Sequence, residues 1–79
     1  MSHADTIGTI EHGGKTYEID WPEDPGDETK RNEMCGFIYL GDVQVGECAP
    51  PGGLPLTNEK QVMDAAWDTI RDGETDDQQ

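Results

Sequence analysis

The sequence predicts an α+β fold in which two β-hairpins form one antiparallel sheet, in the order β-β-β-β-α, and one C-terminal helix packs on a face of that sheet. Three features predict it: a strictly alternating apolar segment, pairs of apolar runs joined by glycine-containing dipeptides, and a later segment with apolar residues at helical spacing. A length of 79 residues suits a single domain. We expect an ordered core over residues 5–73 and flexible tails at residues 1–4 and 74–79.

The first hairpin is expected to join residues 6–11 to residues 15–21 through a Gly-Gly turn. Apolar side chains alternate along its second arm, at Tyr17, Ile19 and Trp21. Glu18 and Asp20 fall on the other face, as in a half-buried strand. Gly8 interrupts the alternation of the first arm and predicts a bulge there.

The second hairpin is expected to join residues 35–40 to residues 43–48 through the turn Gly41-Asp42. A two-residue turn places Leu40 opposite Val43, so that paired residue numbers sum to 83. The first of these strands is apolar on both faces, which predicts a central place in the sheet.

The same register places Cys35 directly opposite Cys48, at a site without cross-strand hydrogen bonds where side chains come closest. A cross-strand disulfide is geometrically compatible with that pairing. In a reducing cytosol both residues would instead remain free thiols, and the two interpretations stay open.

The helix is expected to begin after Thr57 or Asn58, with Gln61 at the third helical position if Asn58 is the cap, and to end before Gly73. Apolar side chains fall on one stripe, at Met63, Ala66, Trp67 and Ile70. We expect Trp67 to meet Trp21 in the core. The alternative is a partly exposed tryptophan that anchors an interface.

Asp64, Asp68 and Asp72 lie opposite that stripe and form an acidic ridge along the helix. Four residues at the helical rise separate successive carboxylates by about 6 Å, close to the spacing of phosphates along a nucleic-acid strand. Like charges four residues apart repel, and the helix dipole disfavours anions near the C-terminal end. A segment that opposes its own stability in this way suggests a function, whereas the plain alternative is a solvated face.

A second acidic patch is expected on the sheet and in residues 22–32, which hold no apolar residue beyond prolines and are interpreted as a mobile surface loop. The carboxylates of this patch are Glu18, Asp20, Glu23, Asp24, Asp27 and Glu28. The ring of Tyr39 would add an anchor that does not depend on charge.

The charge balance limits what the chain can bind. It carries 18 Asp and Glu residues against five Lys and Arg residues, for a formal net charge of −13. Direct binding to nucleic acid is not expected, because phosphate contacts need clustered cations, and an anionic membrane would repel the chain for the same reason. The longest apolar run is Phe37–Leu40 and no secretion signal is visible, so we expect a cytoplasmic location.

Few residues can carry catalysis. Ser2 is the only serine, His3 lies beside it in the expected tail, and His12 lies at a hairpin turn. Paired-acid catalysis needs a pocket that raises the pKa of one carboxyl group, and so small a core leaves little volume for one. Neither CxxC nor HxxxH spacing occurs, which argues against a zinc site built from Cys35, Cys48 and the histidines. We therefore expect a protein that is not an enzyme and uses no cofactor or metal.

A short, strongly acidic α+β chain without catalytic motifs resembles the anti-CRISPR and anti-restriction proteins of phages and mobile elements, several of which mimic DNA or occlude a DNA-binding channel. The resemblance implies an inhibitor whose acidic residues pair with the Lys and Arg that normally hold target DNA. It implies as target the DNA-binding channel of a CRISPR effector, with a type I surveillance complex favoured because its backbone offers long basic surfaces. We expect such an inhibitor to be a monomer in the host cytoplasm.

Two alternatives come from other classes of protein. One is an acidic regulatory or antitoxin-like module that docks on a basic enzyme without touching a DNA site. The other is a small structural domain whose acidity is an adaptation to high salt.

Overall fold

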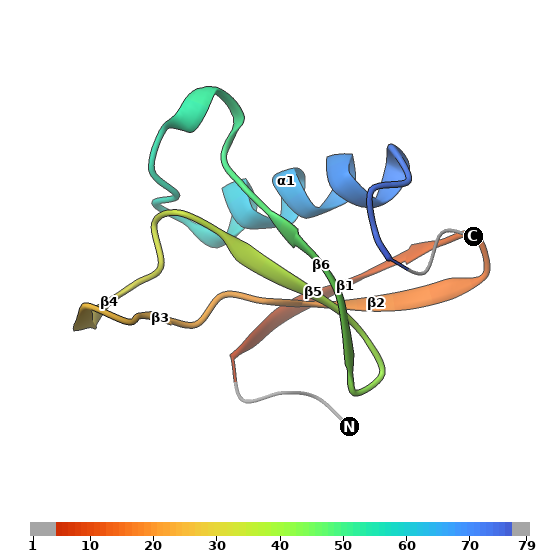
Figure 1. Ribbon diagram of the computed structural model, residues 1–79, viewed down its shortest axis with the longest axis horizontal. Helices are drawn as coiled ribbons and strands as arrows, with labels where there is room; N and C mark the ends of the chain where they lie inside the picture. The colour runs from red at the N-terminus through yellow and green to blue at the C-terminus, as the bar shows by residue number, and fades with distance from the viewer. Residues whose placement is uncertain (1–4, 77–79) are drawn as a thin grey trace.

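The structure, a computed structural model, describes residues 5–76 and has an α+β fold (Figure 1). A four-stranded antiparallel sheet has the strand order β1-β2-β5-β6, and a two-stranded sheet pairs β3 with β4. The elements are β1 (Thr6–His12), β2 (Lys15–Asp20), β3 (Glu23–Asp24), β4 (Asp27–Arg31), β5 (Gly36–Leu40), β6 (Val43–Cys48), the 3-10 turn η1 (Pro51–Gly53) and α1 (Glu59–Arg71). The predicted sheet of two hairpins with a C-terminal helix on one face is confirmed, and β5 is a central strand as predicted.

The first hairpin forms as its turn residues predict. Gly13 and Gly14 have φ angles of 62° and 80°, values that suit a tight hairpin turn and that residues with a Cβ rarely adopt. The register shifts between Thr6 and Gly8, which confirms the predicted bulge. Gly8 also lies under the helix, since a Cβ there would stand 3.0 Å from the Met63 Cε atom.

The second hairpin keeps the predicted register only near its turn. Leu40 pairs with Val43 and Tyr39 with Gln44, but beyond them a bulge shifts the register, and Cys48 faces Gly36. The predicted pairing of Cys35 with Cys48 is therefore wrong. The shift has a physical reason: in the predicted register Glu47 would face the helix and Cys48 the solvent side, whereas the bulge buries Cys48 and leaves Glu47 exposed.

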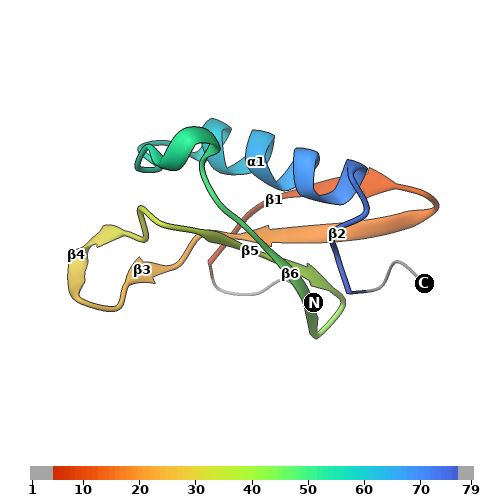
Figure 2. The same ribbon diagram turned by 45° about the horizontal axis from the view of Figure 1, so that its top comes forward.

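Residues 22–32, interpreted from the sequence as a loop, form instead a hairpin that projects beyond the main sheet (Figures 1 and 2). We call Glu23–Arg31 the arm. The Asp24 side chain accepts a hydrogen bond of 2.7 Å from the Gly26 amide and so closes the turn. At the base, the Asn32 amide donates to the Pro22 carbonyl at 2.9 Å. The strands of the arm are held by the hydrogen bond at the turn and by the one at the base, and they contain no apolar residue. Hydrophobic periodicity therefore does not predict them.

The helix begins after Asn58, whose side chain accepts a hydrogen bond of 2.9 Å from the Gln61 amide, as one of the two predicted caps. Gly73 follows the helix with a φ of 74°. The face against the sheet differs from the predicted stripe, because its buried residues are Val62, Ala65, Ala66 and Ile70, with Met63 partly buried.

Trp67 does not enter the core, so the predicted contact between the two tryptophans is wrong. Trp67 is 39% exposed, and its ring stands edge-on to that of His12 with centroids 5.5 Å apart. The reason is the rotation of the helix: with Val62, Ala65, Ala66 and Ile70 buried against the sheet, Trp67 falls at the edge of the buried face, beside His12.

The expected polar tail begins later than predicted. Thr75 is only 4% exposed, and the Asp76 amide donates a hydrogen bond of 2.6 Å to the Val45 carbonyl. Residues 74–76 therefore belong to the fold, against the expectation that the tail starts at Glu74. The predicted tails at 1–4 and 77–79 lie outside the described residues. Among residues 5–76, no helix is long and apolar enough to cross a membrane.

Candidate protein-binding surfaces

The acidic ridge of α1 is exposed, but its charge is partly neutralised. Asp64 lies 3.1 Å from Lys60, and Arg71 lies 2.9 Å from Asp68 and 3.7 Å from Asp72. These pairs join residues four, three and one position apart, spacings that can be read from the sequence. Exposed pairs of this kind contribute little to stability, yet they place a cation beside each carboxylate of the ridge.

A second acidic surface lies on the sheet face that points away from the helix, which we call the open face. Figure 2 shows α1 on one side of the sheet, and no helix or strand between residues 5 and 76 covers the other side. Alternation along the paired strands places ten side chains on the open face: Thr6, Thr9, Glu11, Thr16, Glu18, Asp20, Phe37, Tyr39, Gln44 and Glu47.

Two cross-strand rows organise the open face. In the first, Glu18 pairs with Tyr39, which pairs in turn with Gln44. In the second, Asp20 pairs with Phe37, which pairs with Glu47. Each aromatic ring, both of them partly buried, therefore has a carboxylate as its direct cross-strand neighbour.

The sheet brings together three of the predicted binding residues, Glu18, Asp20 and Tyr39. Phe37, Glu11 and Glu47 join them and had not been selected as binding residues. Phe37 could have been found from its alternation with Tyr39. Glu47 could not, because the bulge in β6 decides its face.

Asp20 differs from its expected role as a projecting charge. It is only 6% exposed, and its Oδ1 atom accepts a hydrogen bond of 2.8 Å from the Thr6 hydroxyl. The Asp20 carboxylate therefore lies at the base of the open face and does not project from it. Glu18 is half-buried in the neighbouring row.

The strand positions of the open face differ in charge from those of the arm and of α1. Four carboxylates lie on the open face, and no Lys or Arg occupies a position of that face in the described strands. Lys15 pairs with His12 beside the turn of the first hairpin, and the other four cations belong to the arm and to α1. The open face thus has a carboxylate at four of its strand positions and a Lys or Arg at none of them.

The arm carries the remaining predicted carboxylates, Glu23, Asp24, Asp27 and Glu28, all of them at least partly exposed. The hydroxyl and the amide of Thr29 donate hydrogen bonds of 2.6 and 3.0 Å to the Asp27 carboxylate, and these lower the pKa of Asp27.

The arm also carries Lys30 and Arg31. Lys30 lies 3.0 Å from Glu33, a hydrogen-bonded pair that raises the pKa of Lys30. Arg31 donates to the Trp21 carbonyl at 3.0 Å. Both cations are therefore engaged near the base of the arm.

Both cysteines are free thiols, so the disulfide alternative is not realised. Cys48 is buried against the helix, where its Sγ lies 3.8 Å from the Val62 carbonyl oxygen. Burial raises the pKa of the Cys48 thiol to about 11, and burial also raises that of Cys35. These shifts favour the protonated and poorly nucleophilic forms.

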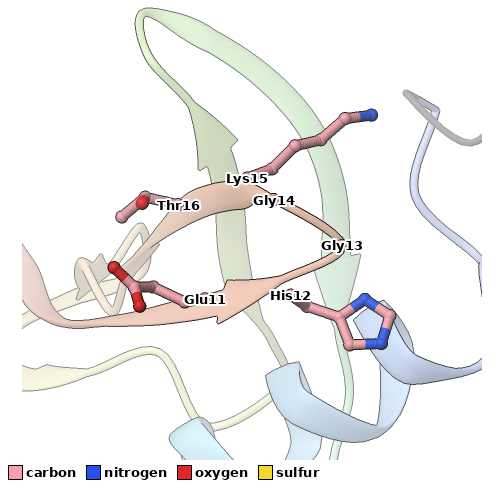
Figure 3. A pocket seen from close by; sticks show the side chains of 6 residues that line it. All are labelled: Glu11, His12, Gly13, Gly14, Lys15 and Thr16. Carbon is pink, nitrogen blue, oxygen red and sulfur yellow. The ribbon is translucent and has the colours of Figure 1, made fainter.

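The described residues form, among others, two hollows in the surface. One, of about 320 Å³, is lined by the hairpin end Glu11–Thr16 (Figure 3), where the His12 ring reaches toward α1 and Lys15 points away from it. The other, of about 250 Å³, lies between the loop after β6 and the first half of α1. Its lining is Pro50, Leu54, Leu56, Gln61, Asp64 and Ala65.

Neither hollow gathers the predicted binding residues; only Asp64 borders one of them. Within residues 5–76, no three His, Cys, Asp or Glu side chains lie close enough to hold a metal ion. The predicted binding residues that do come together are those of the open face.

Comparison with known protein families, with curated protein sequences and with solved structures finds no match to this chain.

Proposed function

We propose that this chain is an acidic binding protein that occupies a basic, nucleic-acid-binding surface of another protein. The observation that carries the proposal is the open face, where four carboxylates have no Lys or Arg among them. A net charge of −13 on 79 residues adds a negative field that attracts a basic groove over distance.

The mechanism is competition for a site. Carboxylates take the place of phosphates against the partner's Lys and Arg side chains, so that the chain and nucleic acid cannot bind together. Electrostatic steering speeds encounter, and salt weakens binding because the exposed charges are screened.

The specific form of the proposal is an anti-CRISPR protein that acts in the cytoplasm of a host cell and blocks target DNA binding by a type I surveillance complex. The resemblance in size, acidity and α+β layout supports this class. The target's long basic surfaces match an acidic face that spans four strands.

The test measures binding of a labelled target duplex to a purified type I surveillance complex as the chain is added. We expect wild type to lower DNA binding, with an effect that falls as salt is raised. The double variant Glu11→Gln/Glu47→Gln removes two exposed charges from the open face. Asp64→Asn/Asp72→Asn removes two from the ridge and is the matched control.

We expect the open-face variant to lose most of the inhibition and the ridge variant to keep most of it, with circular dichroism confirming that both fold. Equal losses would move the interface away from the open face. DNA binding unchanged by wild type, for this complex and for a panel of other basic nucleic-acid-binding proteins, would refute the function itself. Binding that DNA does not displace would favour the regulatory module.

A further inference from the structure

We propose that the hollow between the β6–α1 loop and α1, which we call the loop hollow, binds one aliphatic side chain presented by a basic segment of another protein. The residues that line it are those given above, from Pro50 to Ala65. The loop hollow lies on the helix side of the molecule, away from the open face, so the inference goes beyond the proposed function and does not depend on it.

The walls of the loop hollow are mostly apolar. Pro50, Leu54, Leu56 and Ala65 supply them from the loop and from α1. Leu56 and Ala65 belong to the core, whereas Leu54 is 69% exposed. An exposed leucine beside an apolar hollow loses water contact when a second apolar group enters, and that loss favours binding.

The polar residues of the lining already have partners within the chain. The Gln61 Oε1 atom accepts hydrogen bonds of 2.6 and 2.8 Å from the amide and the hydroxyl of Thr57. The Asp64 carboxylate lies 3.1 Å from Lys60. The loop hollow therefore suits an apolar group better than a polar ligand that needs buried hydrogen-bond partners.

The loop is held in place at both of its ends, and it rises from the sheet to the layer of the helix (Figure 2). The Leu56 amide donates a hydrogen bond of 2.9 Å to the Glu33 carbonyl, and the Gly53 amide donates one of 3.3 Å to the Pro50 carbonyl. The rings of Pro50 and Pro55 further restrict the backbone. A hollow that is formed in advance binds more tightly, because less conformational entropy is lost on binding.

The volume of the loop hollow, about 250 Å³, suits one side chain. Sites for small molecules and cofactors usually measure about 300–1,000 Å³. An apolar cavity of about 150 Å³ is enough for a group the size of benzene. A leucine or methionine side chain therefore fits, whereas a cofactor does not.

The charge of the chain indicates which kind of protein presents that side chain. A second copy would bring a net charge of −13 against the same charge, and the two would repel. Asp64 lies in the lining, and Glu59 lies in the first turn of α1. Lys or Arg residues that flank the inserted side chain would be attracted there, so the occupant is an apolar residue within a basic segment.

The experiment titrates ¹⁵N-labelled protein at low salt with three acetylated peptides: Lys-Lys-Leu-Lys-Lys, Lys-Lys-Gly-Lys-Lys and Glu-Glu-Leu-Glu-Glu. Amide shifts give each dissociation constant and locate each peptide. Burial of a leucine side chain is worth roughly tenfold in affinity, so we expect that preference for the first peptide over the second. Its shifts should fall on residues 50–56 and 59–65, and the third peptide should not bind.

Leu54→Ser removes the exposed wall of the loop hollow. Val43→Ser is the matched control, because Val43 is a large apolar residue of similar exposure, 64%, outside the lining. We expect Leu54→Ser to abolish the preference for leucine over glycine and Val43→Ser to keep it. Circular dichroism checks that both variants fold, as the exposure of both positions predicts.

No binding of the leucine–lysine peptide, affinity equal to that of the glycine peptide, or a leucine preference that survives Leu54→Ser would overturn the inference. Equal binding of the glutamate peptide would overturn the choice of a basic segment. A dimer in sedimentation equilibrium that Leu54→Ser disrupts would assign the loop hollow to a second copy instead. The proposed function fails by a different result, namely no effect of the chain on DNA binding by any basic protein tested.

Discussion

Gly36 lies where the sheet and the helix come closest. A Cβ at this position would stand 2.7 Å from Val62 Cγ1, 3.0 Å from Cys48 Sγ and 3.2 Å from the Asp20 carbonyl oxygen. Each of these neighbours is buried, and one is backbone. The position therefore requires the absence of a side chain for steric reasons alone.

We predict that Gly36→Ala destabilises the fold by about 1–3 kcal/mol, the usual cost of forcing a methyl group into a packed core. Urea denaturation followed by tryptophan fluorescence measures it. Gly46→Ala is the control in the neighbouring strand, where the nearest atom to the added Cβ is Thr75 Cγ2 at 3.3 Å. A loss for Gly36→Ala no larger than for Gly46→Ala would contradict the close packing of helix and sheet.

The thiols of Cys35 and Cys48 lie in different environments. Cys48 is buried with a pKa raised to about 11, whereas Cys35 is partly exposed. At pH 8 a thiol with that pKa is ionised in about one molecule in a thousand, and only the thiolate reacts quickly with alkylating reagents.

We predict that iodoacetamide at pH 8 modifies Cys35 of the native protein well before Cys48. Peptide mass spectrometry of samples taken over time measures the two rates. In denaturing guanidinium both thiols should react at similar rates, which serves as the control. Faster reaction of Cys48 in the native protein would show that the helix does not cover it.

Among the elements, the arm depends on one arginine at its base. Arg31 donates to the Trp21 carbonyl at 3.0 Å, and its guanidinium lies over the Trp21 ring at 5.4 Å. The Trp21 indole N–H donates to the Asn32 carbonyl at 2.6 Å and ties the same base from the other side. Because β4 is exposed along its whole length, these contacts at the base, rather than buried apolar side chains, hold the arm against the main sheet.

We predict that Arg31→Ala loosens the arm without unfolding the main sheet. Amide hydrogen exchange of residues 27–31 should become faster, while that of β2 and β5 stays slow. Lys30→Ala is the control, since the Lys30 side chain pairs with exposed Glu33 rather than with the core. Equal acceleration in both variants, or none in either, would mean that Arg31 does not anchor the arm.

At the scale of the whole molecule, the excess of negative charge disfavours the compact folded state. The chain has 13 more acidic than basic residues, so ion pairs such as those on α1 and between Lys30 and Glu33 can neutralise only a minority of the carboxylates. Repulsion among the remaining carboxylates destabilises the folded state relative to a more expanded chain. Salt screens it over a length of about 10 Å at 0.1 M and about 3 Å at 1 M.

We predict that the melting temperature rises by roughly 5 °C between 0.02 and 0.5 M NaCl, which corresponds to about 1 kcal/mol for a domain of this size, and then levels off. Calorimetry at constant pH measures it. A plateau is expected because screening is nearly complete by then. A rise that continues through several molar salt would instead favour the salt-adapted structural domain.

Local chemistry was enough to predict much of this molecule. The alternation at Tyr17, Ile19 and Trp21, the glycine turns and the Asn58 cap each depend on residues close together in the chain, and each is found in the structure. The ridge at Asp64, Asp68 and Asp72 follows in the same way from helical geometry and lies exposed on α1.

Contacts between distant segments decided the rest. The bulge in β6 turns Cys48 inward and Glu47 outward, and the helix face that packs on the sheet leaves Trp67 at its edge. A single inserted residue moves the side chains beyond it to the other face of a sheet, so the position of the bulge in β6 places Glu47 beside Phe37. The sequence by itself determined the elements and the sign of the charge, whereas only tertiary pairing decided which acids and rings share the open face.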